Sequence, residues 1–159
     1  MMAMEIKTVG YDHPDAARLI DGIQQEMVVR YGGPDETPVE PAQFSPPNGL
    51  FLVGYRDGEP VACGGWRSHG NGTVEIKRMY VVPQARGNGY ARRLLAELEH
   101  TARRAGHRRI ILETGEKQPE AVALYRSAGY GDVPPFGHYA CAPGSIHLGK
   151  NLDAPEDSG

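Results

Sequence analysis

The feature of this sequence that most constrains its fold is a glycine-containing segment at residues 84–91, which reads QARGNGYA. It follows a segment with strand character and precedes a long segment whose apolar residues recur at helical spacing. Gly87 and Gly89 let the backbone turn tightly and approach a ligand without interference from a Cβ atom. The amides that follow lie at a helix N-terminus, where unpaired N–H groups and the helix dipole attract phosphate. The segment therefore predicts a strand–turn–helix unit that favours phosphate, with Arg86 as an additional charged contact.

Other interpretations of this turn make different demands on the sequence. A dinucleotide-binding fingerprint needs a third glycine three positions after Gly89, where Arg92 stands. A P-loop needs a Gly-Lys-Ser or Gly-Lys-Thr sequence, which this chain lacks. A plain strand-to-helix connection needs only the glycines. The turn alone therefore leaves nucleotide binding and a purely structural role open.

The rest of the chain alternates between the two-residue period of strands and the 3.6-residue period of helices. We expect helices at residues 14–31, 90–105 and 119–128, and strands at residues 6–9, 50–55, 60–66, 73–82, 109–114, 130–133 and 145–152. Asp57-Gly58 and Asn71-Gly72 predict tight hairpins, and the proline-rich residues 32–49 predict a long irregular loop. This order predicts one α/β (α+β) domain over residues 1–152, with a mixed sheet flanked by helices, and a disordered tail at residues 153–159.

The composition argues against several classes of protein. A net charge of −3 argues against nucleic acid as the main partner. No run of 18 apolar residues is present, and the N-terminus lacks the features of a secretory signal, so we expect a cytoplasmic protein without a membrane partner. The two distant cysteines and the absence of an HExxH pattern predict no metal site. Residues 77–109 nevertheless hold nine Lys and Arg against two Glu, which indicates either a local anionic ligand or a solvated helix face.

Two segments together resemble the GNAT N-acetyltransferases. Residues 81–91 (VVPQARGNGYA) resemble the acetyl-CoA motif of that family, Gln/Arg-x-x-Gly-x-Gly/Ala. Residues 118–130, with Ala121, Leu124, Tyr125, Gly129 and Tyr130, resemble the second cofactor segment of the family. The two segments stand in the family's order and separation, so that the resemblance covers roughly residues 74–130. It implies the GNAT acyl-CoA N-acyltransferase fold, with a central mixed β-sheet flanked by helices and acetyl-CoA as the co-substrate.

The resemblance also implies which residues bind the cofactor. The glycine turn would hold the pyrophosphate, and the strand before it would pair with the pantetheine arm through Met79 and Val81. Gln118 stands where many members carry Asn and would contact the pantetheine from its side chain. The residues of the turn that are expected to bind are Gln84, Arg86, Gly87, Asn88, Gly89, Tyr90 and Ala91.

Acetyl transfer to an amine requires a proton acceptor, a donor for the oxyanion and a proton for the departing thiolate. Tyr125 matches the family tyrosine near the CoA sulfur, although a core tyrosine is the alternative. Glu75 is the leading candidate for the general base, with a surface ion pair as the alternative. Glu113, on the next strand, is the rival, either as the base or as a partner for a substrate ammonium. The oxyanion donor is expected to be a backbone amide such as that of Val81.

The histidines, the cysteines and the remaining aromatic residues give less information about the site. We assign no catalytic role to the histidines at positions 69, 107, 138 and 147. Residues 134–139 fall where the family often has a loop that covers the substrate, and its aromatic residues are candidates for lining an acceptor pocket. Trp66 and Tyr31 are similar candidates for an acceptor pocket, with core packing as the favoured interpretation. A covalent acyl-cysteine is set aside because neither Cys63 nor Cys141 has a histidine beside it.

The sequence therefore predicts an acyltransferase that moves an acetyl group from acetyl-CoA to a primary amine of a small molecule, directly in a ternary complex. Acetylation of protein N-termini or lysines is an alternative, and so is a catalytically silent CoA-binding sensor domain. The ten acidic residues among the first 66, including Asp35 and Glu36, favour a cationic acceptor. A homodimer is an open possibility by analogy with the family.

Overall fold

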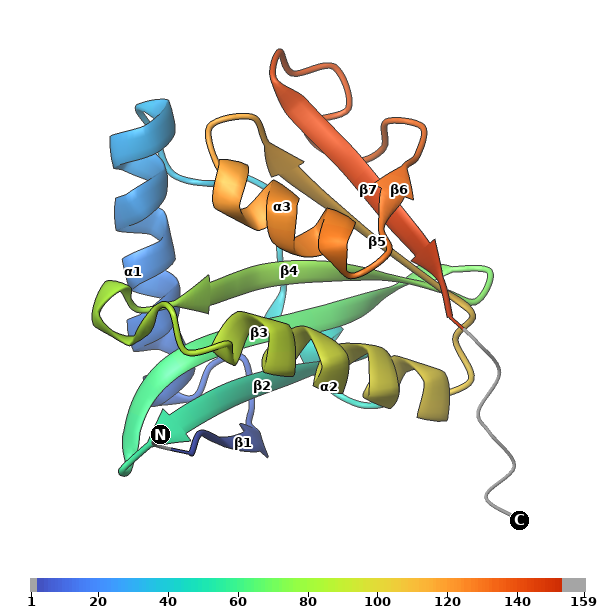
Figure 1. Cartoon of the computed structure of the whole chain (residues 1–159). Coiled ribbons are helices and arrows are strands. Elements are labelled where there is room, and N and C mark those ends of the chain that lie inside the picture. Colours follow the sequence, from blue (N-terminus) through green and yellow to red (C-terminus); the bar gives the residue numbers. More distant parts are fainter. Residues whose placement is uncertain (1–2, 153–159) are drawn as a thin grey trace.

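The computed structural model describes residues 3–152, and Figure 1 shows one mixed sheet with helices on both of its faces. The seven strands follow the order β1-β2-β3-β4-β5-β7-β6. The elements are β1 (Glu5–Thr8), α1 (Pro14–Tyr31), β2 (Gly49–Arg56), β3 (Glu59–Gly70), β4 (Thr73–Val81), α2 (Tyr90–Arg104), β5 (Arg109–Gly115), α3 (Pro119–Ser127), β6 (Gly131–Asp132) and β7 (Ser145–Asn151). This confirms the predicted order of helices and strands and the predicted fold class. The predicted tail at residues 153–159 lies outside the described residues.

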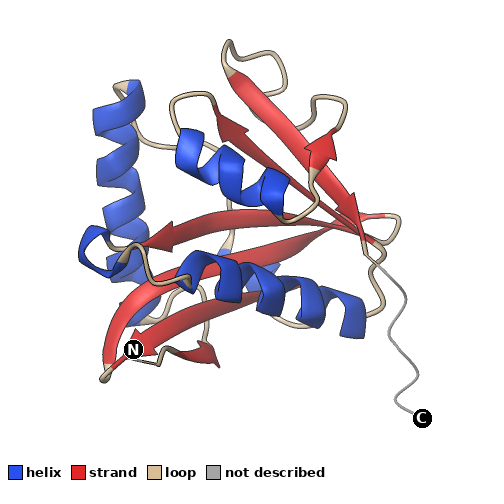
Figure 2. Ribbon diagram, in the orientation of Figure 1, coloured by secondary structure: helices blue, strands red, loops and turns tan. Residues whose placement is uncertain are grey.

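The two faces of the sheet carry separate apolar cores. Leu50 and Leu52 of β2 pack with the buried face of α2, whereas Phe51 and Val53 of the same strand pack beneath α1. Successive side chains of a strand point to opposite faces, so a continuous apolar run is expected where both faces are covered. Figure 2 shows α2 and α3 on the near face of the sheet and α1 apart from them. The uninterrupted apolar run in β2 thus has a structural cause.

The predicted turns and caps form as the sequence indicates. Asp57-Gly58 and Asn71-Gly72 all adopt positive φ angles, between 52° and 79°, as two-residue hairpins of the primed type require. Helix α1 begins at Pro14, with the His13 Nδ1 atom accepting a hydrogen bond from the Asp15 amide. These local signals are strong because few residue types tolerate such backbone conformations.

Three details differ from the predictions. Strand β3 continues to Gly70, four residues beyond Trp66, because it pairs with β4 up to the second hairpin. The predicted strand at residues 130–133 shortens to Gly131–Asp132. Arg78 in β4 has a φ of 62°, and the register between β3 and β4 shifts beside it. Nothing in the alternation of β4 indicates this bulge, because it depends on the pairing of the strands.

Gly49, at the start of β2, lies against the backbone of η1, the 3₁₀ helix Pro41–Phe44. A substitution at this position tests how closely the two elements pack. A Cβ atom at this position would clash with the Gln43 carbonyl oxygen and lie 2.6 Å from the Trp66 carbonyl oxygen. Backbone atoms of two paired elements cannot move aside cheaply, so Gly49→Ala is expected to lower the free energy of unfolding by about 2 kcal/mol. Denaturation in urea measures this change.

Gly131→Ala is the matched control, because a Cβ atom there meets nothing within 4 Å. We expect this substitution to change the free energy of unfolding by less than about 0.5 kcal/mol. Equal effects of the two substitutions would show that the close approach at Gly49 is not what limits stability.

Candidate active site

An opening lies at the centre of the sheet, where β4 and β5 separate. The two strands pair in parallel only between residues 73–75 and residues 109–111. Beyond that point the strands diverge, as Figure 1 shows. A cavity of about 110 Å³ fills the opening and is lined by residues 76–80 of β4, residues 112–114 of β5 and side chains of α1 and α3, together with Asp35. The opening exposes strand edges that an ordinary sheet would pair.

The backbone of β4 directs polar groups into this opening. The Val82 amide donates to the Val61 carbonyl over 2.9 Å, and Ala62 stands opposite Val81 in the register. This pattern makes Ala62 and Val81 a non-hydrogen-bonded pair of the antiparallel ladder. The Val81 amide therefore points away from β3 and toward the side on which β5 has separated. This is the orientation expected of a group that pairs with an extended ligand or an oxyanion.

Strand β4 leads directly into the glycine turn and helix α2. Gly87 and Gly89 have φ angles of 84° and 77°, and a Cβ atom on either would meet nothing within 4 Å. Gly89 is the N-cap of α2, and no side chain caps this helix. Helix α2 has 15 residues, and the dipole of a helix of this length favours a phosphate at its N-terminus. The glycine turn thus has the backbone geometry that the sequence led us to expect.

The other predicted residues of the turn have differing surroundings. Asn88 donates from Nδ2 to the Ala85 carbonyl, which closes the turn. Tyr90 is buried in the core, Ala91 is partly buried against the core, and Gln84 is exposed. Arg86 forms an ion pair with Glu26 of α1 at 2.9 Å and also donates to the Val81 carbonyl. A phosphate that contacts Arg86 would therefore have to compete with the Glu26 carboxylate for the guanidinium group. The sequence did not indicate the ion pair between Arg86 and Glu26.

A larger cavity of about 420 Å³ adjoins the opening. The two cavities share six lining residues, Met27, Asp35, Lys77, Glu113, Thr114 and Gln118. The walls of the larger cavity come from residues 31–36, after α1, and from residues 139 and 142–145, before β7. The Tyr139 hydroxyl accepts a hydrogen bond from the Glu36 amide at 2.8 Å and so ties these two loops together. The two cavities are therefore adjoining spaces that share one wall.

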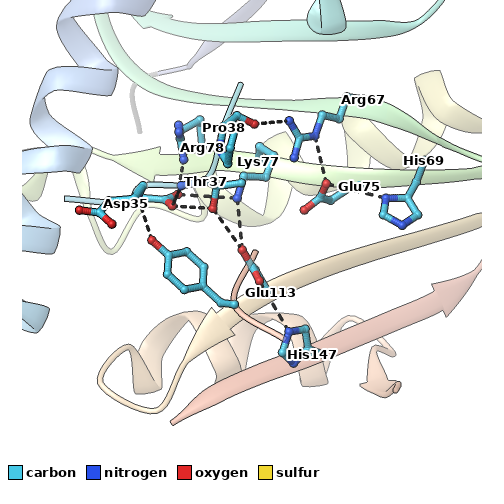
Figure 3. A network of polar contacts seen from close by, with 12 residues as sticks. Asp35, Thr37, Pro38, Arg67, His69, Glu75, Lys77, Arg78, Glu113 and His147 are labelled. Atoms are coloured by element: carbon cyan, nitrogen blue, oxygen red, sulfur yellow. Dashed lines mark hydrogen bonds and ion pairs between the residues drawn. The ribbon is translucent and has the colours of Figure 1, made fainter. Parts of the chain in front are cut away.

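Asp35 anchors the first of these loops to the sheet. Its carboxylate forms ion pairs with Arg78 and, at 3.6 Å, with Lys77, and it accepts hydrogen bonds from Thr37 (Figure 3). Burial by itself would raise the pKa of Asp35, but Lys77, Arg78 and Thr37 outweigh it and lower the pKa to about 2. Of the acidic residues that led us to expect a cationic acceptor, Asp35 is thus already paired with two cations of the protein.

Glu113 lines both cavities, and its carboxylate oxygens lie 3.4–3.6 Å from polar atoms of three other residues. Its Oε1 atom is 3.4 Å from Thr37 Oγ1 and 3.5 Å from Lys77 Nζ. Its Oε2 atom is 3.6 Å from His147 Nε2. Figure 3 shows Lys77 and His147 on different sides of the Glu113 carboxylate. Glu113 is thus a buried carboxylate at the boundary of the acceptor space.

Glu75 lies in a different environment. It sits in the paired part of β4, opposite Ile111 of β5, and only 3% of it is exposed. Its carboxylate accepts a hydrogen bond from Arg67 Nε at 3.0 Å, and His69 Nδ1 is 4.0 Å away. Glu75 does not line either of the two cavities. The alternative interpretation of Glu75, an ion pair with a neighbouring strand, matches this geometry better than the role of base.

Tyr125, Gln118 and Met79 all line the smaller cavity, as their predicted roles require. Tyr125 is buried on α3, and burial raises the pKa of its phenol above the ordinary value, so that it keeps its proton at neutral pH. Gln118 precedes α3 and donates from Nε2 to the Tyr31 hydroxyl at 3.2 Å. Tyr31 is 40% exposed and lines the larger cavity, so core packing, the favoured interpretation, was wrong for it, and the alternative of a pocket-lining residue matches its position.

Tyr139 and Phe136, two aromatic residues of the loop before β7, have different surroundings. Tyr139 lines the larger cavity, whereas Phe136 packs between the rings of His69 and His147. Trp66 is buried, as expected, and donates to Thr101.

The cysteines give no reason to expect an acyl-cysteine. Cys63 is fully buried, and burial raises the pKa of its thiol well above the ordinary value. Cys141 is exposed.

Between residues 3 and 152 there is no group of three or more His, Cys, Asp or Glu side chains arranged to hold a metal ion. Over the same residues, no helix combines the length and apolar character that a membrane span needs.

Comparison with known proteins identifies the family. A family model described as "Acetyltransferase (GNAT) family" matches residues 20–130, which include both segments of the resemblance. The chain belongs to the GNAT family. It is therefore an acyltransferase enzyme of a family that uses acetyl-CoA, as the two sequence segments predicted.

Individual relatives agree with this assignment. An IAA acetyltransferase from Azospirillum brasilense is 44% identical over 107 residues, which are 67% of this chain and 70% of that protein. A protein from Klebsiella pneumoniae assigned as an acyl-CoA N-acyltransferase has a crystal structure similar to this one, with a TM-score of 0.79 and 30% identity, covering 94% of this chain and 98% of that one. The PaiA N-acetyltransferase from Thermoplasma acidophilum, whose structure contains coenzyme A, shares the fold, with a TM-score of 0.73 and 15% identity, covering 94% and 99% of the two chains.

Several residues of this site were not identified from the sequence. Lys77 and Thr37 contact Glu113, Arg78 anchors the loop through Asp35, and His147 faces Glu113 across two strands. A signal for two of them existed, since Lys77 and Arg78 are adjacent charged residues within a predicted strand. Nothing in the sequence links His147 to Glu113, because their contact depends on the pairing of β5 with β7.

The Asp35 anchor predicts a stability that depends on pH. Because the folded-state pKa lies below the ordinary value of 3.8, the stabilisation is fully present above about pH 4 and is lost as the pH falls toward 2. Asp35→Asn is expected to lower the free energy of unfolding by about 2 kcal/mol at pH 7, since each pKa unit corresponds to about 1.4 kcal/mol. The difference from the wild type should shrink below pH 4, as measured by urea denaturation over a pH series.

Asp132→Asn is the control for this prediction. Asp132 also pairs with an arginine, Arg126, but its side chain is 76% exposed. Exposed pairs contribute about 0–1 kcal/mol, so this variant should be close to the wild type at every pH. A loss in the Asp35 variant that stays constant down to pH 3 would contradict the charge-based explanation.

Proposed function

We propose that this enzyme transfers an acetyl group from acetyl-CoA to a primary amine of a small molecule, directly in a ternary complex. The observation that carries the proposal is the opening between β4 and β5, which leads into the glycine turn and adjoins a cavity of about 420 Å³. A cofactor arm in the opening and an acceptor in the cavity would meet beside Lys77 and Glu113, which line both spaces. Direct transfer requires such a meeting of two substrates.

The cofactor is held, in this proposal, by backbone groups more than by side chains. The amides at the start of α2 bind the pyrophosphate, and the free edge of β4 from Met79 to Val81 pairs with the pantetheine arm. Gln118 contributes a side-chain amide from the opposite wall. The positive φ angles of Gly87 and Gly89 support this arrangement, because they allow ligand and backbone to approach closely.

The chemistry uses three groups around the opening. The Val81 amide stabilises the oxyanion, and the Tyr125 phenol, which keeps its proton, donates a hydrogen bond to the CoA thiolate as it leaves. Glu113 accepts the proton that the acceptor ammonium must lose before its nitrogen can attack. The lining position of Glu113 favours it over Glu75 for this role.

The acceptor is a small molecule because its space is a bounded cavity. The Glu36–Tyr139 hydrogen bond joins the two loops that form its walls, and this leaves less room for a protein segment than an open groove would. Glu36 and Glu113 among the lining residues favour an ammonium group. Acetylation of a protein and a silent CoA-binding domain are the alternatives to be tested. The cytoplasmic location and the homodimer remain predictions from the sequence.

Two measurements test the proposal. Calorimetry should show that the folded protein binds CoA and acetyl-CoA. A panel of amines, incubated with acetyl-CoA and the enzyme, should give release of free thiol that depends on the amine. Polyamines, amino acids, arylamines and lysine-containing peptides form the panel, so that the same assay separates small molecules from protein acceptors.

The outcomes distinguish the alternatives. Binding of CoA without thiol release from any amine would support the sensor domain. Turnover restricted to peptides would favour protein acetylation. No binding of CoA or acetyl-CoA, together with thermal stabilisation by ATP or NAD, would overturn the proposal in favour of a nucleotide site.

Paired substitutions decide between the two carboxylates. Glu113→Gln is expected to lower kcat at pH 7 by about 100-fold, because a positioned general base contributes roughly 10²–10⁴-fold. Glu75→Gln, in the ion pair with Arg67, is expected to change kcat by less than about threefold. Thiol release at saturating amine measures both. The opposite ranking would restore Glu75 as the base.

A further inference from the structure

Two buried polar atoms face each other on the side of Glu113 away from Lys77. Glu113 Oε2 and His147 Nε2 lie 3.6 Å apart, and over residues 3–152 they are the two buried side-chain nitrogen or oxygen atoms that lack a hydrogen-bond partner. An unpartnered buried polar group costs about 1–3 kcal/mol. Two such atoms in contact range, one of them a carboxylate oxygen, indicate a hydrogen bond that forms under working conditions.

The pairing of β5 with β7 brings Glu113 and His147 together beside the larger cavity. Glu113 of β5 stands directly opposite His147 of β7 in the antiparallel register, so both side chains leave the same face of the sheet. Glu113 lines the cavity, whereas His147 lies behind it and is only 6% exposed. The Phe136 ring covers the imidazole, with its centroid 5.1 Å from that of His147. His147 therefore reaches the acceptor only through Glu113.

The contacts divide the two oxygens of Glu113 between different partners. Oε1 lies near Thr37 Oγ1 and Lys77 Nζ, at 3.4 and 3.5 Å. Oε2 lies 3.6 Å from the imidazole Nε2 atom and has no hydrogen-bond partner among residues 3–152. Every one of these distances is long for a charge-assisted hydrogen bond, which is ordinarily 2.7–2.9 Å. Long contacts around a catalytic base commonly tighten when substrate is bound.

We propose that His147 is the positioning residue of Glu113. Its Nε2–H group donates to Oε2 and fixes the plane of the carboxylate, so that Oε1 remains directed at the ammonium group of the acceptor. This inference rests on the proposed function, because it assigns His147 to the base of that reaction. A carboxylate held at one oxygen loses less freedom when it takes up the proton, and such alignment affects kcat more than binding.

His147→Leu and His147→Gln test the proposal together. Leucine removes the donor and is expected to lower kcat about 10-fold, with the KM for acetyl-CoA unchanged. Glutamine keeps an amide N–H donor and is expected to stay within about threefold of the wild type. If the leucine variant melts below the assay temperature, His147→Met replaces it as the apolar substitution.

A double-mutant cycle separates positioning from a merely structural role. If His147 acts through Glu113, the leucine substitution has no further effect on kcat in the Glu113→Gln background. Independent, multiplicative losses in the double mutant would overturn the proposal, and so would equal losses in the leucine and glutamine variants. Calorimetric affinity for CoA and thermal melting verify that each variant is folded.

His69→Leu is the matched control. His69 contacts the other side of the Phe136 ring and lies 4.0 Å from Glu75, but it is half-exposed and lines neither cavity. Its kcat should equal that of the wild type. Wild-type protein that binds CoA but gives no amine-dependent thiol release would overturn the proposed function and this inference with it. An active wild type with an unaffected leucine variant would overturn the inference alone.

Discussion

The end of hydrogen bonding between β4 and β5 is the constraint on which the rest of the structure depends. Only three residue pairs join these central strands, after which the backbone of β4 presents amides to an opening instead of a neighbouring strand. Backbone polar groups require partners, so an unpaired central edge is a binding surface for an extended ligand. The glycine turn then continues the same strand into a helix N-terminus suited to phosphate. One interruption of the sheet thus creates both halves of the cofactor site that we propose.

Paired charges hold the acceptor side of this opening in place. Arg78, at the bulge of β4, and Lys77 beside it neutralise Asp35, and this links the loop after α1 to the sheet. Because a buried charge is costly without a partner, the three side chains specify one position for that loop. Lys77 also approaches Glu113, so the anchor of the loop and the carboxylate of the active site share a cation. The position of the loop and the environment of the proposed base, Glu113, are therefore connected.

Local signals explain how far sequence reasoning reached. Asp57-Gly58, Asn71-Gly72 and the glycines of residues 84–91 need backbone angles that few residues adopt, so their turns were predicted correctly. The apolar stripe of α2 and the prolines at the starts of α1 and α3 placed the helices. The sequence favoured Glu75 over Glu113 as the base, although both are strand glutamates and only the structure shows that Glu113, not Glu75, lines the cavities. Core packing was favoured for Tyr31 over a place in the acceptor pocket, whereas the structure has it lining a cavity.

By itself, the sequence determined the order of elements, the strand–turn–helix unit for phosphate and, through two segments in the right order and separation, membership of the GNAT family. These are properties of residues close together in the chain. The tertiary structure decided where β4 and β5 separate, which carboxylate lines the cavity, and that His147 faces Glu113. Such contacts join residues 34 or more positions apart, and only the pairing and register of strands bring them together. The physical reason is that register depends on the whole sheet, while a turn depends on the residues within it.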